Sequence, residues 1–249
     1  MSKPVTLRFF AELNDFLPAH KRHSAFGCDI KKTRSVKDLI ESLGIPHIEV
    51  DLIIVNQQSV DFSHQIEGGE QIRIYPANCQ PAITPLLHNQ PPPLANPRFV
   101  LDVHLGRLAN YLRMLGFDTL YRNDYDDPTL AEISASEQRI LLSCDIKLLT
   151  RKQVVYGYFV RSRKPSQQIL EVSRHYRLNR YPQTLDRCIN CNGIIHAVNK
   201  QDILDQLLPL TRKHYDEFFQ CDSCHKIYWE GSHYQKIQSQ IEKFKNSTH

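Results

Sequence analysis

The sequence lacks a long hydrophobic segment and a strong excess of charge of either sign. No apolar run in its 249 residues approaches the ~18 residues that span a bilayer, so we expect no transmembrane helix and no membrane partner. The N-terminal stretch MSKPVTLRFFAEL lacks the apolar core of a signal peptide. A net charge of +4 permits a polyanionic partner without requiring one. The apolar content of 41% and the charged content of 23% are typical of a soluble globular protein.

Cysteines are also few, and four of the seven fall into two Cys-x-x-Cys pairs. In a chain for which no secretion signal is expected, such pairs favour metal binding over disulfides and a cytoplasmic location. The other three, Cys28, Cys79 and Cys144, are predicted to be packing residues. No Ser, Cys or His residue stands in a pattern that suggests a catalytic triad.

Residues 80–97 contain no glycine and no charged residue but six prolines, which predicts an extended, semi-rigid linker. This linker divides the chain into unlike parts. The predicted parts are an N-terminal domain at 1–79, the linker at 80–97, an α/β domain at 98–181, a cysteine-bearing domain at 182–237 and a polar tail at 238–249.

The N-terminal part has the strand and helix pattern of a β-grasp fold. Ser35 and Gly44 bound a predicted helix, and Gly68-Gly69 marks a turn. The predicted elements are strands at 5–10, 51–56 and 71–76 and a helix at 35–45. The stretches VTLRFFAELNDFLP and GGEQIRIYP resemble the ubiquitin-like sulfur carriers. Those carriers act through a free C-terminal Gly-Gly, whereas this pair is internal, so we expect a stabilising domain or one that binds a protein partner.

Beyond the linker, short apolar runs alternate with helical patterns. Strands are predicted at 99–102, 117–121, 139–145 and 157–160, and helices at 104–115, 128–136, 146–153 and 166–177. This alternation predicts a parallel sheet with helices on both faces. Ligands of such sheets bind at the carboxyl ends of the strands.

Acidic residues gather where those strands end. Asp102 and Asp145 each follow a strand, and Asp118 opens the second strand region. Asp127, in the run NDYDDP, and Glu137 are further candidates. Carboxylates crowded at one edge repel one another unless a cation neutralises them, and Mg²⁺ and Mn²⁺ prefer oxygen ligands. One interpretation is therefore a metal centre that activates water toward a phosphodiester.

A structural interpretation fits the same acids. Asp102 and Asp145 each precede a predicted helix, where Asp is a favoured N-cap. The run NDYDDP could be a solvated turn. Spacing alone leaves both interpretations open.

A basic stretch follows the last of these acids. Nine Lys or Arg residues lie from Lys147 to Arg180 against one acid, Glu171, an imbalance that suits a phosphate backbone. The candidate phosphate contacts are Arg107, Arg113, Lys147, Arg151, Arg161, Arg163 and Lys164. The first two lie off the apolar face of their predicted helix and could equally be ordinary surface cations. Nearby aromatic residues could stack on bases or belong to the core; they are Tyr156, Tyr158 and Phe159.

Two motifs carry a family resemblance. The stretch LDVHLGRLANYLRMLGFDT, followed by RILLSCDIKLL and a paired Cys-x-x-Cys module, resembles the Mut-seven carboxy-terminal RNase family, which is PIN-like. The N-terminal part is similar to the ubiquitin-like domain that precedes this RNase domain in bacterial members. The resemblance implies a PIN-like nuclease fold with a metal-dependent acidic site. The residues that it points to are Asp102, Asp118 and Asp145, then Asp127 and Glu137.

The sequence departs from the family pattern at one point. The family usually has Thr-Arg before its last Asp, whereas Ser143-Cys144 precede Asp145 here. The phosphate contact of that arginine is therefore either missing or supplied by Lys147 or Arg151.

The two cysteine pairs, separated by 29 residues, predict a zinc site. Two thiolate pairs on tight turns close a tetrahedral site and leave no open position for catalysis. We therefore predict structural Zn²⁺ in a zinc ribbon, with a redox dithiol as the alternative. The predicted ligands are Cys188, Cys191, Cys221 and Cys224. Possible rival ligands, or else surface histidines, are His214, His225 and His233.

The aromatic residues of this module allow two interpretations. Tyr228 and Trp229 could form the core of a small ribbon. With Lys226 and Lys236 they could instead form a platform that faces RNA.

These observations predict a cytoplasmic protein made of a β-grasp domain, a PIN-like α/β domain and a zinc ribbon. The predicted activity is hydrolysis of RNA phosphodiester bonds at a Mg²⁺ or Mn²⁺ centre held by Asp102, Asp118 and Asp145. One alternative is a non-catalytic RNA-binding protein that uses the basic face and the zinc ribbon. Another is an adaptor whose β-grasp domain recruits a protein partner.

Overall fold

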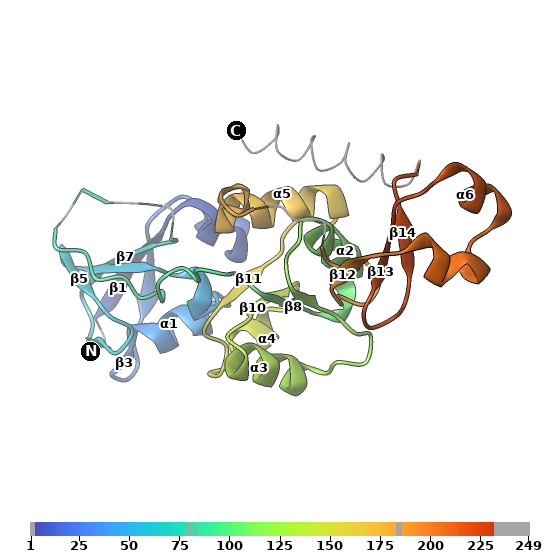
Figure 1. Ribbon diagram of the computed structural model, residues 1–249. Helices are drawn as coiled ribbons and strands as arrows, with labels where there is room; N and C mark the ends of the chain where they lie inside the picture. The colour runs from blue at the N-terminus through green and yellow to red at the C-terminus, as the bar shows by residue number, and fades with distance from the viewer. Residues whose placement is uncertain (1–2, 78, 80, 83, 183–185, 232–249) are drawn as a thin grey trace. The chain divides into compact units, whose positions relative to one another are not determined.

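The computed structural model describes residues 3–77, 79, 81–82, 84–182 and 186–231 (Figure 1). The predicted tail at 238–249, His233 and Lys236 lie outside these residues. The chain divides into two compact units. The first comprises residues 1–94 and 127–159, and the second comprises residues 95–126 and 160–249. No helix among the described residues is long and apolar enough to cross a membrane.

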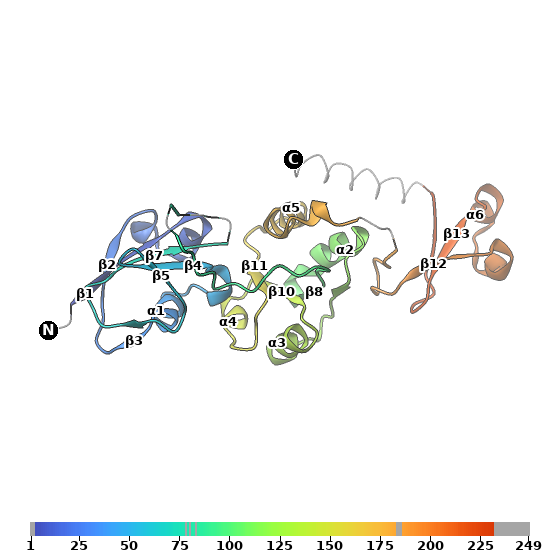
Figure 2. The ribbon, with the colours of Figure 1, turned by 60° about the vertical axis from the view of Figure 1, so that its left-hand side comes forward.

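The N-terminal domain has the predicted β-grasp fold. Its elements are β1 (Pro4–Phe9), β2 (Phe26–Asp29), β3 (Arg34–Ser35), α1 (Val36–Ser42), β4 (Leu52–Val55), β5 (Gln58–Val60), β6 (Gln65–Ile66) and β7 (Gln71–Tyr75). The main sheet runs in the order β2-β1-β7-β4-β5. Its central pair, β1 and β7, is parallel, and the other neighbours are antiparallel. In Figure 2 this sheet and α1 are the blue and cyan part of the chain.

Local signals in the sequence place these elements. Ser35 caps α1, because its hydroxyl accepts the backbone N–H of Asp38 at 3.1 Å. Gly68 turns the chain with φ +115°, and a Cβ there would lie 2.6 Å from the carbonyl oxygen of Lys3. The alternating residues of β1 and the apolar face of α1 then bury one core, which includes Leu7 and Leu39. The predicted cap and turn are both confirmed.

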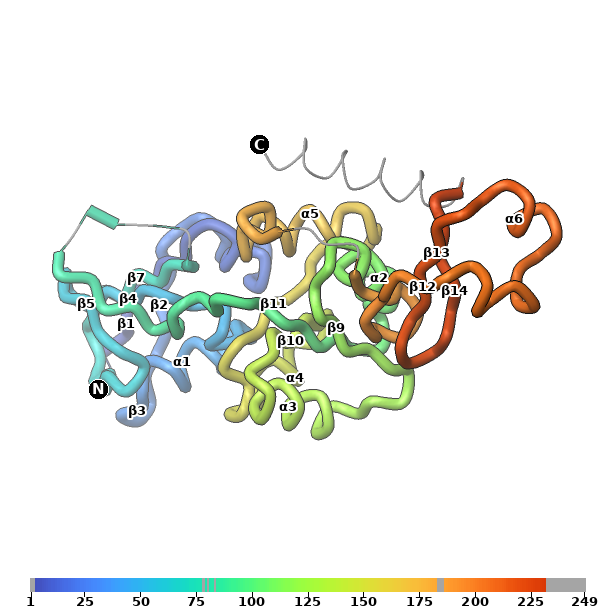
Figure 3. Tube along the Cα trace, in the orientation of Figure 1, coloured from blue at the N-terminus to red at the C-terminus, as the bar shows by residue number. Residues whose placement is uncertain are grey.

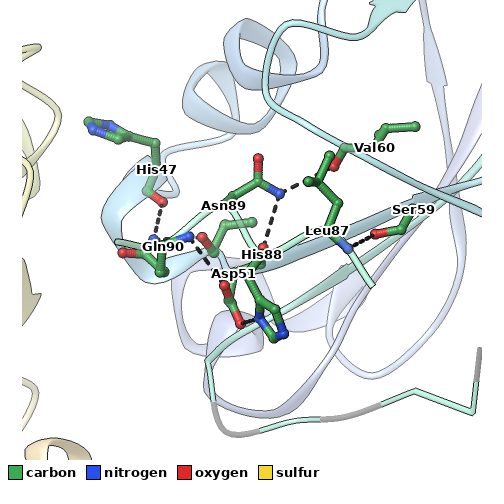
Figure 4. A network of polar contacts seen from close by, with 9 residues as sticks. His47, Asp51, Ser59, Val60, Leu87, His88, Asn89 and Gln90 are labelled. Carbon is green, nitrogen blue, oxygen red and sulfur yellow. Dashed lines mark hydrogen bonds and ion pairs between the residues drawn. The ribbon is translucent and has the colours of Figure 1, made fainter. Parts of the chain in front are cut away.

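The middle of the predicted linker is hydrogen-bonded to the β-grasp domain (Figure 4). The carboxylate of Asp51, only 4% exposed, lies 2.7 Å from His88 Nδ1 and accepts the N–H of Gln90 at 3.2 Å. Asn89 donates two hydrogen bonds to the carbonyl oxygen of Asp51, at 2.8 and 3.0 Å. The side chain of Gln90 donates to the carbonyl oxygen of Val50 at 2.6 Å. These residues are therefore part of the domain surface and not a free spacer.

Apolar residues in the linker and directly before it also pack on the β-grasp sheet. Cys79 and Leu86 pack on a small cluster formed by Leu52, Ile54 and Tyr75. Figure 3 traces the chain through this segment. The composition of residues 80–97 predicts their extended backbone but not these contacts, since the partners are strand residues far away in the sequence.

We expect Asp51→Ala to lower the free energy of unfolding of the protein by about 1 kcal/mol, because it removes the buried acceptor of the His88 ring and of the N–H of Gln90. Urea titration followed by circular dichroism measures the change. The control is Asp29→Ala, an exposed acid on β2, which should change it by less than about 0.5 kcal/mol. Equal stabilities for the two variants would mean that the Asp51 network does not hold the linker.

The central domain has the predicted alternation of strands and helices. Its elements are β8 (Phe99–Leu101), α2 (Gly106–Met114), β9 (Thr119–Leu120), α3 (Asp127–Ser136), β10 (Ile140–Ser143), α4 (Ile146–Leu149), β11 (Gly157–Phe159) and α5 (Pro165–Tyr176). The sheet order is β11-β10-β8-β9, and the pairs β10–β11 and β8–β9 are parallel. The fold class is therefore as predicted. Helix α4 is shorter than predicted, because the chain turns at Thr150, whose hydroxyl donates to the carbonyl oxygen of Lys147 at 3.0 Å.

Within the first unit, β11 contacts the β-grasp domain. The buried carboxylate of Glu49 accepts the N–H of Phe159 at 2.7 Å, and the rings of Phe16 and Phe159 lie 5.2 Å apart. Tyr158 is 6% exposed, and the hydroxyl of Tyr156 donates to the carbonyl oxygen of Pro92 at 3.5 Å. These aromatic residues serve packing, which favours the core interpretation over base stacking.

The cysteine-bearing module is a small antiparallel ribbon. Its elements are β12 (Ile195–Val198), α6 (Pro209–His214), β13 (Phe218–Cys221) and β14 (Ile227–Trp229), with a 3-10 helix at Lys200–Gln206. The sheet order is β12-β13-β14. Trp229 pairs in register with the buried Phe218, and its ring lies 6.4 Å from that of Tyr215. Trp229 is therefore half-buried and packs on the ribbon.

Candidate acidic site and cysteine centre

Asp102 is placed by a buried strand and used as a helix cap. The three residues of β8 are fully buried, and Asp102 follows them directly with 5% of its surface exposed. Its Oδ1 accepts the N–H of His104 at 2.8 Å, which caps the 3-10 turn Val103–Leu105. A carboxylate has about four acceptor sites on its two oxygens, so one capping bond is compatible with metal binding.

Asp145 occupies the same local setting after β10. Its Oδ1 accepts the N–H of Lys147 at 2.7 Å and caps α4, and its side chain is exposed. The buried hydroxyl of Ser143 accepts the N–H of Asp145 at 2.8 Å. The serine at the point where the sequence departs from the family pattern therefore holds the backbone of the acid. For both Asp102 and Asp145, the predicted N-cap is confirmed.

Asp118 lies in a different environment. Its Oδ1 accepts a hydrogen bond from Asn192 Nδ2 at 2.8 Å, and its Oδ2 lies 3.8 Å from Arg187 Nη2. Its backbone carbonyl accepts the N–H of Phe99 at 2.8 Å, and Thr119 pairs with Phe99 in the parallel register. Asp118 therefore lies at the amino end of β8 and Asp102 at its carboxyl end, ~13 Å apart along the strand, so the predicted grouping of these two acids is wrong. Asn192 and Arg187 both come from the cysteine module. They are residues that the sequence did not single out, since their contact with Asp118 joins positions about seventy residues apart.

The two remaining acids are each close to an arginine. Asp127 opens α3, and its Oδ2 lies 3.8 Å from Arg151 Nη2. Glu137 accepts a hydrogen bond from Nε of the buried Arg139 at 2.7 Å. In these positions the carboxylates orient cations of the same domain.

The predicted phosphate contacts do not all reach the surface. Arg107, Lys147, Arg163 and Lys164 are exposed, and Arg151 and Arg161 are half-buried. Arg113 is 4% exposed, so its predicted surface position is wrong. Its guanidinium donates hydrogen bonds to three backbone carbonyl oxygens and therefore contacts the protein interior instead of solvent.

A single acid shapes the basic loop that follows β11. The carboxylate of Glu171, on α5, accepts the N–H of Arg161 at 2.8 Å and that of Ser162 at 2.9 Å. Gln168, one turn earlier, donates to the carbonyl oxygen of Ser162 at 2.9 Å. The loop is therefore fixed through its backbone, while Arg163 and Lys164 extend to solvent.

The four cysteines of the two Cys-x-x-Cys pairs meet in space. Their Sγ atoms all lie within 4.8 Å of one another, with Cys188 and Cys224 at 3.6 Å and Cys191 and Cys221 at 3.4 Å. A tetrahedral zinc ion with Zn–S bonds of about 2.3 Å places its sulfur ligands about 3.8 Å apart. The donor set and its spacing fit Zn²⁺. Neither His214 nor His225 belongs to the cluster.

The electrostatics of the cluster also call for a cation. Burial raises the pKa of Cys191 to about 12 and raises that of Cys221. Burial works against the thiolate of Cys188 too, but the hydroxyl of Tyr228, 3.1 Å from its Sγ, and the backbone of Cys191 lower its pKa to about 7. A bound metal ion would supply the charge that allows all four thiols to ionise.

The first cysteine pair forms a tight turn that we call the knuckle, Cys188–Gly193. The N–H of Cys188 donates to the carbonyl oxygen of Gly193 at 2.8 Å, and Asn192 has the left-handed φ of +73°. A Cβ at Gly193 would lie 2.8 Å from Cys221 Sγ. Glycine at this position therefore lets the second cysteine pair approach the knuckle closely.

The predicted acids do not gather as the cysteines do. In the described part of the chain, the cysteine cluster is the one group of three or more His, Cys, Asp or Glu side chains with ligand atoms so close together. The cysteines are thus assembled for a metal ion by the fold itself. The acids Asp102 and Asp145 are instead presented singly, each at the end of its own strand.

Comparison with known families covers most of the chain. A family model described as the Mut7-C RNAse domain matches residues 97–241, and one described as Mut7-C ubiquitin matches residues 2–81. No curated protein and no solved structure matches. The first family match spans more than half of the chain and contains both the acids and the cysteine cluster. The chain therefore belongs to the Mut7-C RNase domain family and carries a Mut7-C ubiquitin domain before the RNase domain.

Proposed function

We propose that this protein is a ribonuclease that hydrolyses RNA phosphodiester bonds with Mg²⁺ or Mn²⁺ held by Asp102 and Asp145. The observation that carries the proposal is the repeated setting of Asp102 and Asp145. Each follows a buried strand of the domain that matches an RNase family, and each spends one carboxylate oxygen on a capping bond. Carboxylate oxygens are the preferred ligands of both ions.

Asp118 is not a metal ligand in this proposal, because it precedes β9, whose Thr119 pairs with Phe99, and so lies at the opposite end of β8 from Asp102. Asn192 and Arg187 of the cysteine module hold its carboxylate instead. Asp127 and Glu137 act in this proposal through the cations that they contact, Arg151 and Arg139. When bound, the metal ion would polarise the phosphate and lower the pKa of a water molecule.

The basic residues of the chain bind the RNA backbone in this proposal. Arg107, Lys147, Arg163 and Lys164 are exposed, and Glu171 fixes the backbone of the loop that bears the last two. Each contact of this kind adds affinity without base specificity and weakens as salt increases. Since Cys144 stands where the family has arginine, Lys147 is our candidate for the contact nearest Asp145.

The test is cleavage of end-labelled RNA, single-stranded and structured, by the full chain with its zinc retained. We expect cleavage to depend on added Mg²⁺ or Mn²⁺. The double variant Asp102→Asn/Asp145→Asn should lose about 10³-fold in rate or more, because it removes two negative ligands of the metal ion. Cleavage by this variant at the wild-type rate would overturn the proposal.

A second function, RNA binding without cleavage, is favoured by one observation. The family arginine before the last Asp is absent, while the exposed basic residues are present. Salt-dependent binding of RNA with no cleavage under any divalent ion would establish this function instead. A protein partner of the β-grasp domain would be detected as a complex that persists without RNA.

A further inference from the structure

A buried arginine joins helix α2 to the cysteine knuckle. Arg113 is 4% exposed, and its Nε donates to the carbonyl oxygen of Thr119, in β9, at 3.0 Å. Its Nη1 donates to the carbonyl oxygens of Ile189 and Asn190 at 3.1 and 3.0 Å. These two residues are the ones between the first pair of cysteines. One guanidinium thus links the strand to the turn that holds two of the zinc ligands.

The charge of Arg113 has a counterpart in the knuckle. Burial lowers the pKa of Arg113, while the thiol groups of Cys191 and Cys188 and the carboxylate of Asp118 act in the opposite direction. A zinc ion with four thiolates carries a net charge of about −2. A buried cation beside such a centre is stabilised by it, and the planar guanidinium can serve several carbonyl oxygens at once.

Asn192 makes a second link between the same two elements. Its side chain is 8% exposed and bridges two neighbours, since Oδ1 accepts the N–H of Thr119 and Nδ2 donates to Asp118 Oδ1, both at 2.8 Å. Its own carbonyl oxygen accepts a hydrogen bond from Arg187 Nη1 at 3.1 Å. Its side chain therefore bonds Thr119 of β9 and the preceding Asp118, while its N–H donates to the carbonyl oxygen of Cys188 within the knuckle at 2.9 Å.

Strand β9 depends on these links. It has two residues and stands at the end of the sheet order, so β8 is its neighbour within the sheet. The amide of Thr119 finds its acceptor in Asn192, outside the sheet. An edge strand this short gains little stability by itself.

We propose that zinc at the four cysteines fixes β9 and the side chain of Asp118 through Arg113 and Asn192, so that zinc binding and the order of this strand are coupled. Arg113 and Asn192 are positioning residues in this arrangement. The coupling is independent of whether the protein cleaves RNA. By linkage, whatever zinc contributes to the order of β9, the contacts of β9 contribute equally to zinc affinity.

The test is hydrogen exchange resolved to single amides in the full chain, with zinc bound and after its removal by a chelator. Zinc content is measured in each sample. We expect the protection of the Thr119 amide to fall by about 10-fold or more on zinc removal, because its acceptor lies on the knuckle. The reference amide is Leu141, in β10, which donates to the carbonyl oxygen of Tyr156 at 3.0 Å and should stay protected.

The matched variant is Asn192→Gly. Glycine adopts the left-handed φ of +73° without strain, so the knuckle keeps its backbone while the bridging carboxamide is lost. We expect the variant to bind zinc but to show the low protection of Thr119 even when loaded, with no further fall on zinc removal. A merely structural role of Asn192 would instead lower protection equally in both states.

Zinc affinity gives the reciprocal measurement. Arg113→Lys keeps the charge but loses the fork that reaches both knuckle carbonyls, and we expect about 10-fold weaker zinc binding in competition with a chromophoric chelator. Arg107→Lys, at an exposed position of α2, should bind zinc as the wild type does.

Three results would overturn the proposal. They are equal protection of Thr119 with and without zinc, an equal fall at Leu141, and full protection of Thr119 in zinc-loaded Asn192→Gly. If Arg113→Lys fails to fold, the hydrogen-exchange measurements on the wild type and on Asn192→Gly still test the proposal.

Discussion

We expect Asp102→Asn to lower the rate of RNA hydrolysis by about 10³-fold while the protein stays folded, because the substitution separates the two roles of this residue. Asparagine caps helices as well as aspartate does, so the bond from the N–H of His104 at 2.8 Å is retained. The negative charge is lost, and a neutral amide oxygen is a much weaker ligand for Mg²⁺ or Mn²⁺. The kinetic assay at saturating metal, together with a thermal melt of the same sample, measures both roles.

Two further variants calibrate this result. Asp102→Ala removes the cap as well, and we expect it to lose about 1 kcal/mol of stability in addition to the activity. Asp124→Asn changes an exposed acid paired with Arg122 at the surface and should leave the rate unchanged. If Asp102→Asn cleaved RNA as fast as Asp124→Asn, Asp102 would be a helix cap and nothing more.

The sequence predicted the features that local rules determine. The cap at Ser35, the turn at Gly68 and the strand ends before Asp102 and Asp145 each depend on neighbours within a few positions. Alternating apolar runs were enough for the order of strands and helices. The spacing of the cysteine pairs was enough for the cluster that they form. These elements form as the sequence predicts because no contact with a distant part of the chain overrides the local preference.

Features that depend on distant partners were not predictable. Arg113 lies off the apolar face of α2 and was expected at the surface. It is buried because carbonyl oxygens more than seventy residues away accept hydrogen bonds from its guanidinium. The sequence did not indicate the role of Asn192, because an asparagine between a cysteine pair and a glycine is typical of an ordinary turn. The contacts of the linker were not predictable for the same reason, because Asp51 bonds residues almost forty positions later in the chain.

The acids show where pattern reasoning stops. In the sequence, Asp102, Asp118 and Asp145 are three acids beside predicted strands, but the structure shows that the first two differ in what holds them. Asp102 caps its own chain two residues on, whereas Asp118 is held by the cysteine module. A motif records that a carboxylate is present; only the fold says which side chains orient it. Because residues of the cysteine module hold Asp118, the zinc site is expected to affect the position of this carboxylate.

Loss of one zinc ligand is expected to have the largest effect on stability. We expect Cys221→Ser to abolish stoichiometric zinc binding and to lower the free energy of unfolding by more than about 3 kcal/mol, since structural zinc contributes far more than this to small domains. Cys221 is 1% exposed, and its strand β13 pairs with β12 and β14. A serine hydroxyl does not ionise near neutral pH and cannot replace the thiolate. Metal analysis and urea titration of the full chain measure both changes.

The control for this experiment is a cysteine outside the cluster. Cys28, on β2 of the β-grasp domain, is not among the gathered thiols, so Cys28→Ser should keep its zinc. If Cys221→Ser retained one zinc ion per chain, a different ligand would have to complete the site, and the assignment of the four cysteines would be wrong. If it lost zinc but kept its full stability, the ribbon would fold without metal. In that case zinc binding and the order of β9 would not be coupled, because the knuckle, which Arg113 contacts and which contains Asn192, would keep its shape without the metal ion.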